Sequence, residues 1–270
     1  MSDIRHPSHE GKSLFNTAED RQAKILSLLR DEPFVEIRGL TERLQVSVAT
    51  VRRDLAELEE AGLLRRTHGG AVGTSQIGQD TTHAARAVSY QSEKAAIGAA
   101  AASMIVDGDA VMLDAGTTSL EVAKRLGAYK GLTAISNGMD IINEMVRNDA
   151  QAVYAVGGHY SESNRSFRGP LAEQFIRQFN ADKLILNVSS IDIERGLICT
   201  ASPENAAVQR AMIEVSSRVI VVADHSKLTK SSLSVTARIE DVGVIVTDAG
   251  ARSIIEMAPE KLRRKFVIAN

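Results

Sequence analysis

Apolar positions in the first quarter of the chain recur with the spacing of short amphipathic helices. The pattern predicts a first helix over about residues 18–31 and a short second helix around residues 40–44. Ser47 is placed to cap a third helix, and Gly62 is placed to end it. The predicted buried face of that third helix is Val51, Leu55 and Leu58.

A different pattern begins near Ser92. Short apolar runs of strand length alternate there with helical segments. The predicted strands are residues 110–113, 132–135, 153–156, 184–188, 219–223 and 242–246. The predicted helices are residues 93–105, 118–126, 138–148, 170–179, 204–216 and 250–257. Strands that are apolar throughout and separated by helices indicate an α/β fold, with a parallel sheet covered on both faces.

These patterns divide the chain into four predicted parts. Residues 1–17 are expected to be a disordered tail, and residues 18–72 a winged helix-turn-helix, in which a β-hairpin follows the three helices. Residues 73–91 are polar and predicted to be a linker, and residues 92–270 form the larger α/β domain.

Composition narrows the class of protein. A hydrophobic content of 44% and a net charge of −2 fit a globular protein without a general basic coat. The chain has no apolar run of membrane-spanning length and no apolar leader at its N-terminus, so a cytoplasmic location is expected. Cys199 is the only cysteine, and the six histidines lack metal-ligand spacing, so neither a metal nor another cofactor is predicted.

The third predicted helix carries residues suited to reading DNA. With its apolar face inward, Ala49 and Arg53 point outward, flanked by Thr50 and Arg52. Ala49 allows close approach or a methyl contact, and Arg53 can pair with guanine in the major groove. Thr50 and Ser47 can hold phosphates at the positive end of the helix.

The predicted hairpin supplies a second positive element. Arg65, Arg66 and His68 can reach phosphates or a minor groove, and Gly69 and Gly70 permit a tight turn. The acidic residues of this segment roughly equal its basic ones, so its spacing alone fits a solvated surface as well as a DNA-binding face.

An ordered string of residues separates these alternatives. The segments 46–55, 58–59, 62–64 and 68–71 closely resemble the VSxxTIRRDLxxLExxGLLxRxHGGA pattern of the DeoR (GlpR-type) family of bacterial transcriptional regulators. The resemblance implies a DNA-binding winged helix. Gly39 departs from the family, which more often has glutamate there, and predicts a frayed start of the second helix.

The candidate ligand site of the second domain is the segment Asp114-Ala115-Gly116-Thr117-Thr118. It lies between a predicted strand and a predicted helix, where open α/β sheets bind ligands and where a helix N-terminus favours an anion such as phosphate. An ordinary strand-to-helix turn is the alternative. Ser136-Asn137-Gly138, Gly157-Gly158-His159 and the segment ending in Lys227 also follow strands. Lys227 is either a phosphate partner or a surface lysine.

Residues 94–248 resemble the sensor domain of the same family, through its DxGTT loop, SN turn, GG turn and ADxSK segment. That domain has a ribose-5-phosphate-isomerase-like fold and binds a phosphorylated sugar or polyol. The resemblance therefore implies a phosphate at Gly116, Thr117 and Thr118. It places Asp114, Asn137 with the adjacent Gly138, and Lys227 nearby.

Three residues depart from the family pattern of the sensor domain. Asn187 and Ser190 stand where glycines are common, and they either hydrogen-bond an unusual effector or fill space. Arg168 stands where an apolar residue is common, and it either holds a second acidic group of the effector or forms a surface salt bridge.

The resulting prediction is a sequence-specific DNA-binding regulator without a catalytic residue. The resemblance implies a repressor of a sugar or polyol catabolic operon, acting on double-stranded DNA as a homo-oligomer, dimer or tetramer, and released by a phosphorylated effector. One alternative is a sugar-phosphate isomerase-like enzyme, in which Asp114 or Asp224 would be the base. Another is a winged helix that binds protein.

Overall fold

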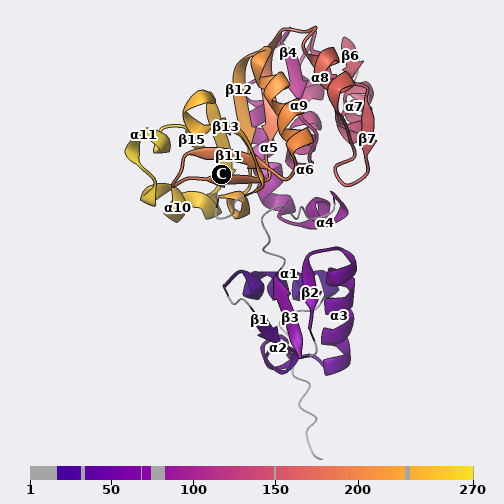
Figure 1. Cartoon of the computed structure of the whole chain (residues 1–270), viewed down its shortest axis with the longest axis vertical. Helices are drawn as coiled ribbons and strands as arrows, with labels where there is room; N and C mark the ends of the chain where they lie inside the picture. The colour runs from indigo at the N-terminus through magenta and orange to yellow at the C-terminus, as the bar shows by residue number, and fades with distance from the viewer. Residues whose placement is uncertain are drawn as a thin grey trace, which may run out of the picture. The chain divides into compact units, whose positions relative to one another are not determined.

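The computed structural model of the chain describes residues 17–31, 34–67, 69–73, 83–148, 150–228 and 232–269 (Figure 1). The chain divides into two compact units, residues 1–75 and residues 76–270. The predicted tail, apart from residue 17, lies outside the described residues. None of the described helices combines the length and the apolar character needed to cross a bilayer.

The N-terminal unit contains three helices and a three-stranded antiparallel sheet. Its elements are α1 (Ala18–Asp31), β1 (Phe34–Glu36), α2 (Ile37–Leu44), α3 (Val48–Glu60), β2 (Leu64–Arg66) and β3 (Gly70–Gly73). The strand order is β1-β3-β2. This is the predicted winged helix-turn-helix, with β2 and β3 as the wing.

Local sequence explains these elements. Ser47 caps α3, and Val51, Leu55 and Leu58 are buried as expected. The helix ends where Gly62 takes a φ of +72°, a left-handed conformation that favours glycine. The frayed start expected at Gly39 is not seen, because α2 begins at Ile37 and continues through that glycine.

A seven-stranded parallel sheet forms the centre of the C-terminal unit. Its order is β15-β14-β12-β9-β4-β5-β6, and all six neighbouring pairs are parallel. Its strands are β4 (Ala110–Leu113), β5 (Thr133–Ser136), β6 (Ala152–Ala155), β9 (Ala181–Asn187), β12 (Ser216–Val222), β14 (Val244–Asp248) and β15 (Phe266–Ala269). All but β15 were predicted from apolar runs.

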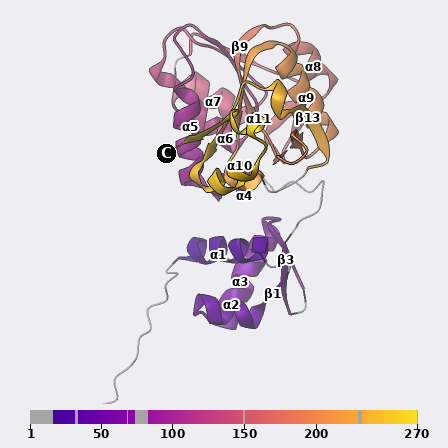
Figure 2. The same ribbon diagram turned by 90° about the vertical axis from the view of Figure 1, so that its left-hand side faces the viewer.

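Helices cover both faces of this sheet (Figures 1 and 2). The α-helices are α4 (His83–Val88), α5 (Gln91–Ala102), α6 (Thr117–Ala123), α7 (Met139–Arg147), α8 (Pro170–Ile176), α9 (Pro203–Glu214), α10 (Arg252–Met257) and α11 (Glu260–Arg263). The 3₁₀ helices are η1 (Leu126–Ala128), η2 (His225–Lys227), η3 (Ile239–Asp241) and η4 (Ala249–Ala251).

Alternation along β9 shows how the two cores arise. Ile185 packs into the core beneath α5, α6 and α7, whereas Leu184 and Leu186 pack into the core beneath α8 and α9. Successive side chains of a strand point to opposite faces, so a strand buried on both sides must be apolar at every position. This is why the strand pattern predicted a doubly covered parallel sheet.

Several short strands lie outside the parallel sheet and were not predicted. One antiparallel sheet contains β10 (Ser190–Asp192), β11 (Leu197–Thr200) and β13 (Ser234–Arg238). A hairpin contains β7 (His159–Ser161) and β8 (Ser166–Arg168). Except for β11, with its apolar residues 197–199, these strands interleave polar with apolar residues and so lack the apolar run that identified the central strands.

The segment predicted as a linker, residues 73–91, contains helix α4. Residues 74–82 lie outside the described residues. Three alanines favour a helix at 83–88, and Ala85 is buried against the α/β unit. His83 lies near Asp140, and Arg86 donates a hydrogen bond to Asn164. Residues 83–88 are therefore a helix packed on the α/β unit and not a linker.

Candidate functional sites

Helix α3 presents a short exposed strip at its N-terminal end. Ala49, Arg52 and Arg53 are exposed, while Thr50 is half-buried. Within the described residues, no hydrogen bond or ion pair engages either guanidinium. Ser47 Oγ accepts a hydrogen bond from the backbone N–H of Thr50 at 3.1 Å, so this hydroxyl caps the helix.

An ion pair that the sequence analysis missed fixes α3 against α1. The buried carboxylate of Asp54 accepts hydrogen bonds from Arg21 Nε at 2.8 Å and from Nη2 at 2.9 Å. These bonds raise the pKa of Arg21 above its ordinary value. An acid three residues after the buried Val51 was the available signal, because a buried charge requires a partner.

The wing is attached to α3 by a second acid. Glu59 accepts the backbone N–H of Arg66 at 2.8 Å and Arg66 Nε at 2.6 Å. Both hydrogen bonds lower the pKa of Glu59. Arg66 therefore already has an intramolecular partner, unlike Arg53. His68 lies outside the described residues, as does the side chain of Arg65.

The two wing glycines have backbone roles. The carbonyl oxygen of Gly69 accepts a hydrogen bond from the N–H of Ile37 at 3.0 Å. A Cβ atom at Gly70 would lie 2.0 Å from the carbonyl oxygen of Val35, so only glycine lets β3 lie this close to β1. Both residues shape the wing.

The α/β unit has a pocket of about 470 Å³, part of it open to solvent, at the carboxyl ends of its strands. Asp114 after β4, Asn137 after β5, Asn187 at the end of β9 and Lys227 in η2 all line it. The other lining residues are Arg86, Ala115, Asn164, Ser166, Val188, Ser189, Thr200, Asn205, Val208 and Gln209. The pocket thus gathers residues from distant segments at one sheet edge.

Three predicted effector residues, Asp114, Asn137 and Lys227, meet in this pocket. Five others do not line it: Gly116, Thr117, Thr118, Gly138 and Arg168. Gly116 precedes α6 without a side chain to cap that helix, and Thr117 and Thr118 are buried. The segment Asp114–Thr118, which the sequence predicts to bind phosphate, therefore borders the pocket through Asp114 and Ala115.

Asp114 is fully buried and belongs to a polar network. Gln209 Nε2 donates to Asp114 Oδ2 at 2.8 Å and to the carbonyl oxygen of Asn187 at 2.7 Å. Thr236 Oγ1 donates to Gln209 Oε1 at 2.8 Å. Burial raises the pKa of Asp114 to about 7, although the hydrogen bond from Gln209 opposes the rise.

Sequence reasoning missed Gln209, which joins α9, β4, β9 and β13. Its signal was a polar residue between Val208 and Ala211, two buried positions of α9. A glutamine in such a stripe must find hydrogen-bond partners, because an unpaired amide in a core is costly.

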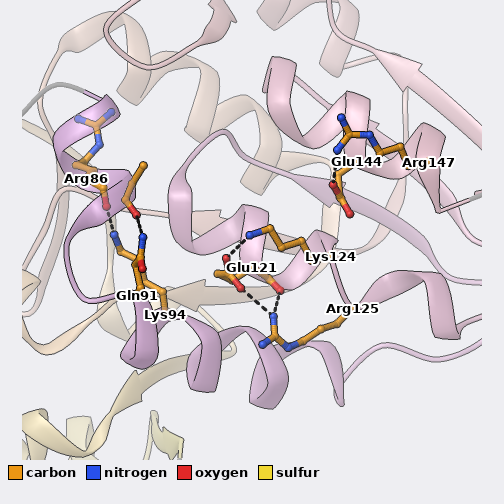
Figure 3. Close-up of polar contacts among 9 residues, drawn as sticks. Arg86, Gln91, Lys94, Glu121, Lys124, Arg125, Glu144 and Arg147 are labelled. Carbon is orange, nitrogen blue, oxygen red and sulfur yellow. Dashed lines mark hydrogen bonds and ion pairs between the residues drawn. The ribbon is translucent and has the colours of Figure 1, made fainter.

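Three cationic side chains lie at or near the pocket: Arg86 and Lys227 line it, and Lys94 lies beside them. Arg86 Nη2 donates to Asn164 Oδ1 at 2.6 Å and to the carbonyl oxygen of Ser163 at 3.0 Å. Lys94 is buried and donates to the carbonyl oxygen of Arg86 (Figure 3). Burial lowers the pKa of Lys94 to about 8, Asp224 raises it, and Lys227 lowers it further.

Two other cationic side chains of this region, Lys124 and Arg125, form ion pairs outside the pocket lining. Glu121 of α6 accepts hydrogen bonds from Lys124 at 2.6 Å and from Arg125 at 3.1 Å (Figure 3). A Cβ atom at Gly98 would lie 2.7 Å from the Glu121 backbone, so glycine is needed where α5 crosses α6. Neither Lys124 nor Arg125 lines the pocket.

Asn137 positions the loop that precedes α6. Its Oδ1 accepts the N–H of Ala115 at 3.0 Å, and its Nδ2 donates to the carbonyl oxygen of Phe167 at 3.2 Å. A Cβ atom at the next residue, Gly138, would lie 3.0 Å from Ala115 Cα. The turn formed by Ser136 and Asn137 therefore brings the end of β5 against Ala115, within the segment Asp114–Thr118.

Two of the residues that depart from the family pattern lie away from the pocket lining. Arg168 lies on β8, and its Nε is buried without a hydrogen-bond partner among the described residues. Ser190 is buried and donates to Ser232 Oγ at 2.9 Å, so it links β10 to a neighbouring segment.

Comparisons with known proteins agree with this arrangement. A DeoR-like helix-turn-helix domain matches residues 21–76, and a DeoR C-terminal sensor domain matches residues 89–249. The transcriptional repressor AccR of Agrobacterium fabrum is 70% identical, covering 95% of this chain and all of that protein. The HTH-type transcriptional regulator GlpR of Haloferax volcanii is 33% identical, covering 88% and 94%.

Two solved structures similar to this chain have low sequence identity to it. A D-ribose-5-phosphate isomerase in complex with phospho-erythronic acid has a TM-score of 0.38 and 13% identity, covering 50% of this chain and 53% of its own. An eIF2B-β2-δ2 complex from C. thermophilum has a TM-score of 0.46 and 11% identity, covering 84% and 82%. Through its two matching domains and its relatives, this chain belongs to the DeoR family of transcriptional regulators, with an N-terminal DNA-binding helix-turn-helix and a C-terminal sensor domain.

Proposed function

We propose that this protein is a repressor whose DNA binding is released when a phosphorylated sugar or polyol enters the pocket of the sensor domain. The observation that carries the proposal is the convergence of Arg86, Lys227 and Asp114 with a set of neutral polar side chains in one pocket. Relatives named as transcriptional repressors support the sign of regulation.

The pocket chemistry suits such an effector. Arg86 and Lys227 offer positive charge for a phosphate, next to the uncapped start of α6 at Gly116. Five carboxamide side chains among the lining residues offer donors and acceptors for hydroxyl groups. A relative from Escherichia coli O157:H7 is named a putative aga operon transcriptional repressor, which supports an operon as the target.

The DNA-reading role belongs to the exposed strip of α3. In this proposal Arg53 reads a guanine, Ala49 and Arg52 approach neighbouring bases and backbone, and Ser47 and Thr50 contact phosphates. The wing, with Arg65, Arg66 and His68 around Gly69 and Gly70, contacts the backbone. A dimer or tetramer would place two such helices on two half-sites.

Helix α4 provides a route between the two functions. It is the first element that the structure describes after the winged helix, and its Arg86 both lines the pocket and holds Asn164. A bound phosphate would compete with Asn164 for Arg86, because a charged acceptor binds guanidinium more strongly than an amide. Moving α4 would then change the spacing of the DNA-reading helices.

The isomerase alternative has less support. Relatives with high coverage are named as regulators. Of the two acids considered as bases, Asp114 is held by Gln209, and Asp224 accepts hydrogen bonds from the N–H and the hydroxyl of Ser226. Purified protein incubated with sugar phosphates should be thermally stabilised by one of them without converting it.

A gel-shift experiment tests the proposal. The chain should bind the DNA upstream of its own gene or of a neighbouring operon in a salt-sensitive manner, and one sugar phosphate should release it. Lys227→Ala should retain DNA binding and weaken the response to that compound, while Lys261→Ala, an exposed lysine of α11, should match the parent. Equal responses of the Lys227 variant and the parent would contradict the assigned effector site.

A further inference from the structure

The five carboxamide side chains that line the pocket are not equivalent. They are Asn137, Asn164, Asn187, Asn205 and Gln209. Each carries an acceptor oxygen and two donor hydrogens, so each can either hold the protein together or bind a ligand. Their hydrogen bonds separate these two uses.

Three of them are engaged by the protein. Asn137 uses its oxygen for Ala115 and its nitrogen for Phe167. Gln209 uses its nitrogen for Asp114 and its oxygen for Thr236. The oxygen of Asn164 accepts from Arg86. These groups form the frame of the pocket.

The side-chain amides of Asn187 and Asn205 differ from these three, because their hydrogen-bonding capacity is not used by the described residues. Neither side chain makes a hydrogen bond to any residue within the described parts of the chain, although both are half-buried in the pocket wall. Their backbones are nevertheless held. The carbonyl oxygen of Asn187 accepts from Gln209 at 2.7 Å, and the N–H of Asn205 donates to Ser202 Oγ at 3.2 Å.

Asn187 also lies against the candidate phosphate segment. A Cβ atom at Gly116 would lie 2.3 Å from Asn187 Cγ, so the carboxamide covers the backbone of that residue. Asn205 enters the same pocket from the first turn of α9. A ligand with its anionic group near Ala115 would extend between these two amides.

We propose that Asn187 and Asn205 are specificity-determining residues that read hydroxyl groups of the effector, so that the pocket selects a polyhydroxylated phosphate over its deoxy analogue. The inference rests on the proposed function of the pocket and assigns its selectivity. A ligand that lacks the hydroxyls would exclude water while leaving amides unpaired, and unpaired polar groups in a closed site penalise binding strongly.

Matched ligand pairs test this assignment. Calorimetric titration and thermal shift would compare ribose 5-phosphate with 2-deoxyribose 5-phosphate, glucose 6-phosphate with 2-deoxyglucose 6-phosphate, and inorganic phosphate. The parent should prefer the hydroxylated member of at least one pair by about tenfold, the effect of one or two hydrogen bonds. Asn187→Ala or Asn205→Ala should reduce that preference toward unity with little change in affinity for the deoxy member.

Two further variants separate recognition from folding. Asn143→Ala, an exposed asparagine of α7, should keep the preference of the parent. Asn187→Asp keeps the shape of the side chain but adds negative charge, so it should weaken binding of every phosphate, inorganic phosphate included.

Each result decides a different claim. If the parent binds each deoxy sugar phosphate as tightly as its hydroxylated partner, the specificity assignment is wrong. It is also wrong if the Asn187 and Asn205 variants keep the preference of the parent. In both cases the proposal that the pocket binds phosphate still stands. If the parent binds none of these compounds, including inorganic phosphate, the proposed function falls together with this inference.

Discussion

Gln209 donates a hydrogen bond from Nε2 to Asp114 Oδ2 across 2.8 Å, and so joins helix α9 to the end of strand β4. The same glutamine binds Asn187 and Thr236, so one side chain connects four elements beside the pocket. The side chains of Asp114 and Gln209 are both buried, so a partner left unpaired there is costly.

Replacing Gln209 with leucine should therefore destabilise the α/β unit. The change leaves Asp114 and Thr236 without this partner in a buried site, which costs about 2 kcal/mol or more. Denaturant unfolding should report the loss. Gln174→Leu, at an exposed position of α8, is the matched control and should change stability little. An unfolding free energy equal to that of the parent would refute the structural role of the network.

Asp114 should make stability depend on pH near neutrality. Its folded pKa is raised to about 7, so the folded state holds the proton more tightly than the unfolded state. The contribution of protonated Asp114 to the free energy of unfolding is therefore fully present at pH values below the ordinary carboxyl pKa. This contribution is lost as the pH rises toward 7.

Asp114→Asn mimics the protonated acid and removes this dependence. The melting temperature of the variant should exceed that of the parent by a margin that grows from about pH 4 to about pH 7 and then levels off. Glu256→Gln, an exposed acid on α10, should show no such margin. A constant difference between variant and parent across that range would argue against the raised pKa.

Arg53→Ala should weaken specific DNA binding. The side chain is exposed and has no partner within the described residues, so its loss removes a base contact worth about 1–3 kcal/mol without disturbing the fold. Fluorescence anisotropy with operator and scrambled DNA measures this as reduced discrimination. Lys24→Ala on α1 serves as the control for general charge. Unchanged discrimination would remove Arg53 from the base-reading set.

Glu59→Ala should loosen the wing. Glu59 holds both the backbone N–H and the guanidinium of Arg66, and so connects β2 to the C-terminal end of α3. Hydrogen exchange of the Arg66 amide should become faster in this variant. Glu60→Ala removes an exposed acid of the same helix and should leave that exchange rate unchanged. Equal protection in both variants would mean that the strand pairing alone holds the wing.

Local patterns of apolar and capping residues in the sequence were enough to predict most of the helices and strands of this protein. Val51, Leu55 and Leu58 predicted the buried face of α3, and Ser47 and Gly62 predicted its ends. Six of the seven central strands were recognisable because each contains a short run of apolar residues, as is typical of strands in a covered parallel sheet. These signals are contained within a few consecutive residues, so they can be read without a structure.

The ordered motifs also identified the family, and the family matches confirmed it. The same motifs directed attention to Asp114, Asn137 and Lys227, which do meet in one pocket. Residues after parallel strands share one edge of a sheet, so their proximity follows from topology.

Only the tertiary structure decided which polar residues serve as partners for one another. Gln209 and Arg86 were missed because their partners, Asp114 and Asn164, lie far away in the sequence. Arg168 was expected among the effector residues but does not line the pocket, to which its strand β8 contributes Ser166 instead. A hydrogen bond depends on distance and direction between two groups, and these are set by the packing of whole elements.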